Sequence, residues 1–332
     1  MPKKPYVYIT RSLPREIVNP LVEKFTVEMW DSDTDPVPRK ILEEKAKAAD
    51  ALLTMLSDSI DRELLSKAEN VKVVANLAVG YDNIDVAYAT ERGIAVCHTP
   101  DILTDTTADL AFSLLLMAAR RLLEASDIVR EGKWNGWSPL FLAGSDVHHK
   151  TIGIVGMGKI GEAVAKRARG FEMNILYHNR HRKPDAEKKW GAVYCSFEEL
   201  LEKSDFVVSL LPLTEETRGM FGKEAFRRMK NTAFFINAGR GAVVDEHALV
   251  QALKEGEIAG CGLDVFEKEP IGPDHPLLQL KQVVALPHIG SASVETRRKM
   301  MARCVENIEK ILEGKRPVNI VNDRVLERLG IS

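Results

Sequence analysis

A glycine-rich turn near the middle of the chain has the residue types and spacing needed to hold a nucleotide. It contains Gly156, Gly158 and Gly161, spaced G-x-G-x-x-G, after a short apolar β-branched run and before a helical pattern. In a dinucleotide site the first glycine permits a tight turn, the second lets the backbone approach the pyrophosphate, and the third lets helix and strand pack closely. N–H groups at the helix N-terminus bind the phosphates. The turn therefore predicts a dinucleotide site, with a turn that serves packing alone as the alternative.

Three polar side chains follow later strand-like runs and could act on a substrate beside that cofactor. Arg240 lies between two glycines, and its planar guanidinium is suited to a carboxylate, with a surface arginine as the alternative. Glu269 and His288 follow two further strand-like runs. A lone histidine is often structural, but a carboxylate at a neighbouring strand end could fix its tautomer and favour its protonated form. Together the three residues suit the reduction of a 2-keto acid beside a nicotinamide.

The strand that follows the glycine turn bears on the choice of nicotinamide cofactor. An NAD site usually places Asp or Glu about 20 residues beyond the glycines, where it binds the ribose hydroxyls. No acidic residue occurs between Glu172 and Asp185, and Arg180, Arg182 and Lys183 stand there instead. Positive charge suits a 2′-phosphate, so the sequence predicts a preference for NADP(H), with NAD(H) possible. A basic, solvated loop is the alternative.

Length and composition narrow the class of protein. With 332 residues, two domains are expected, and a net charge of −2 points to neither nucleic acid nor a membrane surface as a partner. The N-terminus lacks the apolar core of a signal peptide, and the most apolar stretch, 110–119, is too short to span a membrane, so a cytoplasmic location is expected. The cysteines form no C-x-x-C pair and are expected to be buried thiols, with no disulfide framework and no metal site: Cys97, Cys195, Cys261 and Cys304.

Alternating strand-like and helical patterns predict an α/β protein with two doubly wound, parallel-sheet (Rossmann-like) domains. In the first hundred residues the strands are expected at 6–10, 26–30, 51–56, 71–79 and 94–97. The helices between them are expected at 14–25, 39–49, 61–68 and 85–92. Around the glycine turn and beyond it, further strands are expected at 174–177, 205–210, 233–237, 260–265 and 283–286.

Three other segments do not follow this alternation of strands and helices. We expect one helix over 104–130, too apolar to lie against one sheet only and therefore packed across domains or against a second subunit. An aromatic loop, 134–141, could fill an interface or cover the edge of a core. A last helix is expected over 293–313, and the sequence leaves open whether it returns to the first domain.

Six sequence blocks occur in order over nearly the whole chain. They are L-A-V-G-Y-D-N-I-D (77–85), G-M-G-K-I-G (156–161), L-L-P-L-T-E-E-T (210–217), N-A-G-R-G-A-V-V-D-E (237–246), G-L-D-V-F-E-K-E-P (262–270) and L-P-H-I-G-S (286–291). Together they resemble the D-2-hydroxyacid dehydrogenase family, most closely its glyoxylate reductase and hydroxypyruvate reductase branch. This resemblance implies a homodimer with an active-site cleft between two domains. The substrate-binding domain would comprise 1–100 and 291–332, and the NAD(P)-binding domain 101–290.

The resemblance also implies roles for individual residues. Arg240 would bind the substrate carboxylate, His288 would act as the general acid/base, and Glu269 would orient it. The backbone N–H groups of Val79 and Gly80 would hold the other end of the carboxylate. Relatives line the pocket with a tryptophan of the opposite subunit, and the candidate here is Trp137.

The implied cofactor contacts lie in the glycine turn and at the strand ends around it. They are Gly156, Met157, Gly158, Lys159, Ile160, Gly161, Asn179, Arg180, His181, Leu211, Pro212, Thr217, Ala238, Gly239, Arg240, Asp264, His288, Gly290 and Thr107. Asp264 is similar in position to an acidic residue that contacts the nicotinamide amide, and a turn aspartate satisfied by the protein itself is the alternative.

The sequence thus predicts an enzyme that reduces small 2-keto acids, glyoxylate and hydroxypyruvate, with NADPH preferred. An NAD-dependent dehydrogenase of the D-lactate or phenylpyruvate type is one alternative. A nucleotide-sensing binding protein is another, because the family includes corepressors that keep the fold. Formate dehydrogenases of the family carry glutamine where Glu269 stands, so formate oxidation is not expected.

Overall fold

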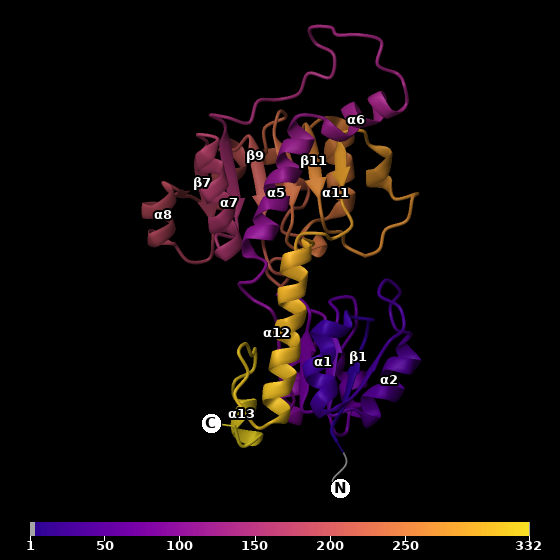
Figure 1. The fold of residues 1–332 in the computed structure, drawn as a ribbon. Helices are drawn as coiled ribbons and strands as arrows, with labels where there is room; N and C mark the ends of the chain where they lie inside the picture. The colour runs from indigo at the N-terminus through magenta and orange to yellow at the C-terminus, as the bar shows by residue number, and fades with distance from the viewer. Residues whose placement is uncertain (1–3, 332) are drawn as a thin grey trace. The chain divides into compact units, whose positions relative to one another are not determined.

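The computed structural model describes residues 4–331, and the chain divides into two compact units. The first unit contains the described residues up to Leu103 together with those from Ser293 onward, and the second unit is Thr104–Ala292. The chain therefore leaves the first unit once, completes the second, and returns (Figure 1). We predicted changes of domain near residues 100 and 290, and the units divide a few residues beyond each. The predicted α/β class with two parallel, Rossmann-like sheets is confirmed.

The first unit is built on a five-stranded parallel sheet in the order β2-β1-β3-β4-β5. Its strands are β1 (Tyr6–Ile9), β2 (Thr26–Met29), β3 (Ala51–Thr54), β4 (Val73–Asn76) and β5 (Ala95–Cys97). Its helices are α1 (Arg15–Lys24), α2 (Arg39–Ala48), α3 (Arg62–Lys67), α4 (Val86–Arg92), α12 (Val294–Leu312) and α13 (Val325–Arg328). Each expected strand and helix before residue 100 is present, within a few residues.

Helix α12 belongs to the first unit, a point that the residue pattern left open and that the family resemblance implied. Helix α12 packs beside α1 and against β3, β4 and β5 (Figure 1). Ser293 caps its N-terminus by accepting the N–H of Thr296 at 3.2 Å. Beyond the helix, Asn322 accepts the N–H of Val96 at 2.8 Å and donates to the carbonyl of Ile94 at 2.9 Å. The C-terminal segment is therefore bonded to the edge strand β5.

The second unit is built on a seven-stranded parallel sheet in the order β12-β11-β10-β9-β6-β7-β8. Its strands are β6 (Thr151–Val155), β7 (Asn174–His178), β8 (Val193–Tyr194), β9 (Phe206–Ser209), β10 (Phe234–Asn237), β11 (Gly260–Leu263) and β12 (Val283–Ala285). Its helices are α5 (Thr104–Ala119), α6 (Leu122–Arg130), α7 (Lys159–Gly170), α8 (Pro184–Trp190), α9 (Phe197–Lys203), α10 (Lys223–Arg228) and α11 (Glu246–Glu255), with short 3-10 turns η1 (Gly241–Val243) and η2 (Pro276–Gln279).

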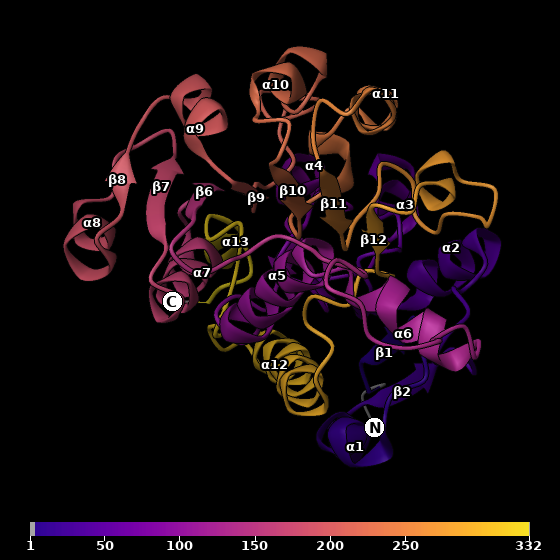
Figure 2. The same ribbon diagram turned by 90° about the horizontal axis from the view of Figure 1, so that it is seen from above.

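Both faces of the second sheet are covered by helices. Figure 2 shows α5 and α7 on one face and α9, α10 and α11 on the other. Two apolar clusters match these faces: one joins α5 and α7 to the sheet, and the other lies under α9, α10 and α11. The strand order reverses between β6 and β9, and open α/β sheets bind ligands beyond the carboxyl ends of the strands at such a point.

The prediction of one helix over 104–130 is wrong. The helix breaks after α5, because Arg121 adopts a left-handed backbone conformation (φ 53°) and pairs with Glu124 at 2.9 and 3.0 Å. The apolar surface of α5 is buried within the second unit, against α7 and strands β10 to β12. A Cβ at Gly262 of β11 would lie 3.2 Å from Cβ of Leu114, so a glycine in the strand admits α5 close to the sheet. The composition of α5 thus needs no second domain or subunit to explain it.

All four cysteines are buried and free, as predicted. Burial raises the pKa of the Cys97 thiol to about 12 and raises the pKa of the Cys261 and Cys304 thiols further, so these groups stay protonated. Within residues 4–331, no helix has the length and apolar character to cross a membrane. The same residues contain no group of three or more His, Cys, Asp and Glu side chains placed to hold a metal ion.

Candidate active site

The glycine turn has the geometry that a dinucleotide requires. Gly156 has φ 103°, which other residues adopt only with strain, and a Cβ at Gly161 would lie 2.3 Å from the carbonyl oxygen of Gly156. A Cβ at Gly158 would meet no atom within 4 Å, so this peptide is open to a ligand. Gly158 is also the N-cap of α7, where the first backbone N–H groups have no partner within the helix. The turn therefore fits a pyrophosphate at the switch point between β6 and β9.

The turn after β10 holds Arg240 in a fixed backbone. The Asn237 side chain accepts the N–H of Gly239 at 3.1 Å and donates to the carbonyl of Arg240 at 3.0 Å. Arg240 is half-buried, and its Nη1 donates to the carbonyl of Gly239 at 3.0 Å. Sequence analysis missed the role of Asn237, although an asparagine directly before a glycine-containing turn is the usual signal for such side-chain to backbone bonds.

The turns after β11 and β12 bring Glu269 and His288 together, as predicted from their positions after two strands. Nδ1 of His288 lies 2.7 Å from Oε2 of Glu269, and Oε1 of Glu269 accepts the N–H of Phe266 at 2.9 Å. The His288 side chain is 23% exposed and the Glu269 side chain is 29% exposed. Because Nδ1 faces a carboxylate, we assign it as the protonated nitrogen, so that Nε2 is the nitrogen available to a ligand.

The surroundings of Glu269 keep it ionised. Burial is the largest single influence and raises its pKa, but the hydrogen bond and the charge of His288, the N–H of Phe266 and the charge of Arg240 together outweigh it. The net result is a pKa of Glu269 below its ordinary value. The carboxylate can therefore hold a proton on the facing imidazole.

Asp264 fixes the backbone on which His288 stands. His288 adopts a left-handed conformation (φ 53°), and the next two N–H groups, of Ile289 and Gly290, each donate to an Asp264 oxygen at 2.7 Å. Asp264 is 1% exposed, and burial raises its pKa above the ordinary value despite these bonds. Its geometry is that of a turn aspartate satisfied by the protein, the alternative considered above. A contact between Asp264 and nicotinamide stays a prediction.

Other predicted cofactor contacts gather at the same carboxyl edge of the sheet. A Cβ at Gly239 would lie 2.7 Å from the carbonyl oxygen of Leu211, which joins the turns after β10 and β9. Oγ1 of Thr217 donates to the carbonyl of Pro212 at 2.7 Å and so shapes the loop after β9. The remaining residues at this edge are Ile160, Ala238, Gly290 and Thr107. Met157, in contrast, is fully buried in the apolar core, so only its backbone can face a cofactor.

The basic loop after β7 is only partly available to a phosphate. Arg182 pairs with both oxygens of Glu187 at 2.7 and 2.9 Å, so a phosphate would compete with this carboxylate for its guanidinium. Arg180 is exposed, and its charge helps to lower the pKa of Glu216, after the hydrogen bonds of Thr214 and of the Glu216 backbone. Asn179 donates to the carbonyl of His181 at 3.0 Å, which shapes the turn. Arg180 is therefore the arginine of this loop with no carboxylate pair described above, and Lys183 follows three residues later.

Comparisons with known proteins agree with this geometry. Residues 112–290 match the family described as D-isomer specific 2-hydroxyacid dehydrogenase, NAD binding domain. The sequence is 52% identical to a glyoxylate reductase of Korarchaeum cryptofilum over 98% of both chains. The chain belongs to the D-isomer specific 2-hydroxyacid dehydrogenase family. The matched residues lie within the second unit.

Two solved structures are similar to this dehydrogenase in fold as well as in sequence. A protein of Thermus thermophilus is 42% identical with a TM-score of 0.89, covering 95% of this chain and 99% of that one. An NADPH-dependent glyoxylate/hydroxypyruvate reductase of Sinorhizobium meliloti, solved with NADP and malonate, is 32% identical with a TM-score of 0.84. That match covers 97% of this chain and 98% of that one. This dehydrogenase thus has the same fold as these two proteins over nearly its whole length.

The predicted substrate contacts in the first unit lie on a fixed backbone segment after β4. The carbonyl of Val79 lies 2.9 Å from Nδ1 of His98, and the carbonyl of Gly80 accepts from Asn76 at 3.0 Å. The first bond orients the peptide plane that contains the N–H of Gly80. The N–H of Val79 shares its plane with the carbonyl of Ala78, which accepts the N–H of Thr99 at 2.9 Å. The predicted substrate role of these N–H groups stays a prediction.

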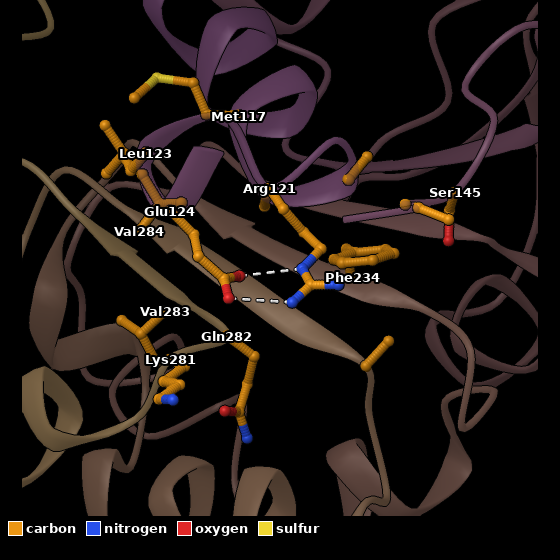
Figure 3. Close-up of a pocket in the computed structure, with 15 residues that line it drawn as sticks. Met117, Arg121, Leu123, Glu124, Ser145, Phe234, Lys281, Gln282, Val283 and Val284 are labelled. Carbon is orange, nitrogen blue, oxygen red and sulfur yellow. Dashed lines mark hydrogen bonds and ion pairs between the residues drawn. The ribbon is translucent and has the colours of Figure 1, made fainter. Parts of the chain in front are cut away.

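A cavity of about 400 Å³ lies in the second unit, but not at this site. It is lined by the end of α5, by Arg121 and Glu124, and by residues at the amino ends of the strands, Phe234 and Val283 among them (Figure 3). The glycine turn, Arg240 and His288 follow the carboxyl ends of the strands. Figure 3 shows the Arg121–Glu124 pair within this cavity, which is separate from the candidate active site.

Proposed function

We propose that this dehydrogenase reduces glyoxylate and hydroxypyruvate to the corresponding 2-hydroxy acids and prefers NADPH. The observation that carries the proposal is the Glu269–His288 pair at 2.7 Å, on the sheet edge that also bears Arg240 and the glycine turn. The names of the Korarchaeum and Sinorhizobium relatives support these substrates, and the second name supports NADPH. A cytoplasmic location stays part of the proposal.

The reaction follows from the chemistry of three side chains. The bound nicotinamide would supply the hydride. Arg240 binds the substrate carboxylate through its guanidinium fork and polarises the keto oxygen. His288 donates the proton on Nε2 to that oxygen as negative charge develops there. Glu269 stabilises the imidazolium by holding the Nδ1 proton.

The two units divide the binding work in this proposal. The glycine turn and α7 of the second unit hold the cofactor diphosphate. The N–H groups of Val79 and Gly80 in the first unit bind the substrate carboxylate together with Arg240. The substrate-binding domain is accordingly 1–100 with 291–332, and the cofactor domain is 101–290.

A panel of substrates and cofactors tests the proposed activity. Initial rates are measured with glyoxylate, hydroxypyruvate, pyruvate and phenylpyruvate, each with NADPH and with NADH. We expect the highest kcat/KM for glyoxylate or hydroxypyruvate with NADPH. A preference for pyruvate or phenylpyruvate with NADH would instead assign a lactate-type dehydrogenase. Tight cofactor binding without turnover of any acid would support the binding-protein alternative.

Removing Arg180 tests the basis of the cofactor preference. We expect Arg180→Ala to raise KM for NADPH about 10- to 100-fold, because a phosphate loses a charge-assisted hydrogen bond, and to change KM for NADH little. Arg182→Ala is the matched control, because its guanidinium already binds Glu187. Equal effects of Arg180→Ala on the two cofactors would remove Arg180 from the 2′-phosphate site.

We propose a homodimer formed through the segment that begins with α6. Large apolar side chains along this segment are exposed, and Trp137 and Leu140 reach 82%. Figure 1 shows α6 and the chain after it extending from the sheet of the second unit. A contiguous run of exposed apolar residues is typical of a protein interface. Trp137 would line the substrate pocket of the other subunit.

Mixing two inactive variants tests whether Trp137 acts across the dimer. The Trp137→Ala and His288→Asn chains are each expected to turn over poorly, and the parent chain is expected to run at twice the mass of one chain in sedimentation. A mixed dimer contains one site with both Trp137 and His288 intact. Random mixing should therefore restore roughly a quarter of the parental activity. No restoration in mixtures proven to contain mixed dimers would place Trp137 in its own subunit's site or outside any site.

A further inference from the structure

The turn that carries Glu269 is held by a carboxylate that the proposed reaction does not use. Glu246, the first residue of α11, accepts the N–H of Glu267 at 2.7 Å through Oε1. Its Oε2 lies 3.2 Å from Nε2 of His275. The Glu246 and His275 side chains are only 16% and 20% exposed, so water competes weakly for these contacts. One carboxylate thus binds the chain on both sides of Glu269.

The peptide that Glu246 holds adjoins the one that holds Glu269. The N–H of Phe266 donates to Oε1 of Glu269 at 2.9 Å, and the next N–H along the chain, of Glu267, donates to Glu246. Two successive N–H groups therefore point at two different carboxylates. The two N–H groups lie in adjacent peptide planes that meet at Cα of Phe266. Loss of the bond to Glu246 therefore frees the backbone on one side of the residue whose N–H aligns Glu269.

Packing ties the same peptide to the turn that carries Arg240. The His275 ring meets the buried Phe266 ring edge to face, with centroids 6.0 Å apart. On the other side, a Cβ at Gly241 would lie 1.8 Å from the carbonyl carbon of Phe266, so the residue after Arg240 is in direct contact with this peptide. The peptide between 266 and 267 thus lies where the turns bearing Arg240 and Glu269 meet.

We propose that Glu246 and His275 are positioning residues for the Glu269–His288 pair. They hold the segment between Glu267 and His275 so that one oxygen of Glu269 meets the N–H of Phe266 and the other meets Nδ1 of His288. Neither residue contacts the reacting atoms in the mechanism above. The kinetic consequences of this inference rest on the proposed function. Its structural consequences rest on the hydrogen bonds alone.

Substitution of Glu246 tests the proposal by kinetics. We expect Glu246→Ala to lower kcat about 10- to 100-fold through misplacement of Glu269, while the dissociation constant of NADPH stays near the parental value. Glu246→Gln should lose less, because its amide oxygen can still accept the N–H of Glu267. Glu255→Ala, at the exposed far end of α11, is the matched control and should match the parent.

The pH profile separates positioning from a general loss of stability. The charged groups that act on His288 include Glu269, at 2.7 Å, and Asp264, whose pKa burial raises and the charge of His288 partly lowers. A displaced Glu269 stabilises the imidazolium less, so the alkaline limb of kcat/KM for reduction should move to lower pH in Glu246→Ala. A rate loss that merely follows the folded fraction, with an unmoved profile, would overturn the proposal.

Hydrogen exchange gives a result that does not depend on turnover. In the ligand-free protein, Glu246→Ala should speed exchange at the N–H of Phe266 as well as at that of Glu267, because Glu269 loses its alignment. Faster exchange at Glu267 alone would overturn the proposal. If the parent protein reduces no keto acid, the proposed function fails, and exchange at Phe266 still decides the role of Glu246.

Discussion

Replacing His288 by asparagine is expected to lower kcat for keto-acid reduction by about 10²–10⁴-fold, the usual contribution of a general acid. The reason is that Nε2 is the only proton donor assigned to the keto oxygen, and Glu269 can orient that donor but not replace it. The dissociation constant of NADPH should stay nearly unchanged, because the glycine turn and α7 hold the diphosphate. Steady-state rates and a fluorescence titration of cofactor binding measure the two effects separately.

The left-handed backbone of His288 determines which substitution is informative. Asparagine tolerates φ near 53° better than alanine does, so it removes the imidazole with little added strain. His149→Asn is a matched control: His149 has φ 61° and lies 3.2 Å from a carboxylate oxygen of Glu172, but it is exposed on the surface. A loss of cofactor affinity as large as the loss of rate would show that His288 is structural.

The pH dependence of the same pair follows from the lowered pKa of Glu269. A depressed pKa means that the carboxylate stays charged as pH falls through the ordinary glutamate range. Its contribution to folding stability is therefore present above the ordinary pKa and is lost only as pH falls through the lower folded-state value. The acid limb of kcat should accordingly lie below the ordinary glutamate range, and Glu269→Gln should abolish that limb while lowering kcat.

Replacing Arg240 by alanine is expected to lower kcat/KM by about 10²–10³-fold, equivalent to about 3–4 kcal/mol of transition-state stabilisation. The guanidinium is the only cation that the second unit places in the proposed set with Glu269 and His288, and its bond to the carbonyl of Gly239 aligns it. Losing it leaves the substrate carboxylate and the developing alkoxide without their positive partner. Because the side chain acts on both ground state and transition state, KM should rise and kcat should fall.

The shape of the guanidinium can be separated from its charge. Arg240→Lys should retain part of the activity, because a point charge remains while the planar fork is lost. Added guanidinium ion should partly restore Arg240→Ala, and Arg228→Ala, on an exposed ion pair with Glu202, should change nothing. The assignment would be contradicted if Arg240→Ala lost as much affinity for NADPH as for the substrate. Such a result would show that the substitution had disturbed the whole turn and not only removed the guanidinium.

The two sheets could be predicted from sequence because their strands are short, apolar and bounded by turn residues. Strands of a parallel sheet covered on both faces read as continuous apolar runs, and β3, β4 and β9 are buried at every position. The glycine turn was equally readable, because backbone geometry requires glycine at 156 and 161 and the open position at 158 keeps the same spacing. Features that depend only on local requirements of this kind can be predicted from residue type and spacing.

One wrong prediction and one contact that was not predicted depend on partners that residue type does not reveal. The break after α5 depends on the left-handed Arg121 and its ion pair with Glu124, within a run that otherwise reads as continuous helix. The contact of Arg182 with Glu187, a residue of α8, was not predicted. In both cases a charged side chain had several possible partners, and the folded backbone selected one of them.

Sequence by itself determined the α/β class, the dinucleotide turn, the buried thiols and the three candidate catalytic residues, because each depends on local pattern or on a recognisable block. Only the tertiary structure decided how α12 packs on the first sheet, that Asp264 holds the backbone of the His288 turn, and that Glu246 and His275 hold the turn of Glu269. These contacts join residues from separate strands and helices. The residues that meet are determined by which strands lie side by side in the sheet, because the loops after neighbouring parallel strands come together at one edge. The order of residues along the chain does not show which strands are neighbours.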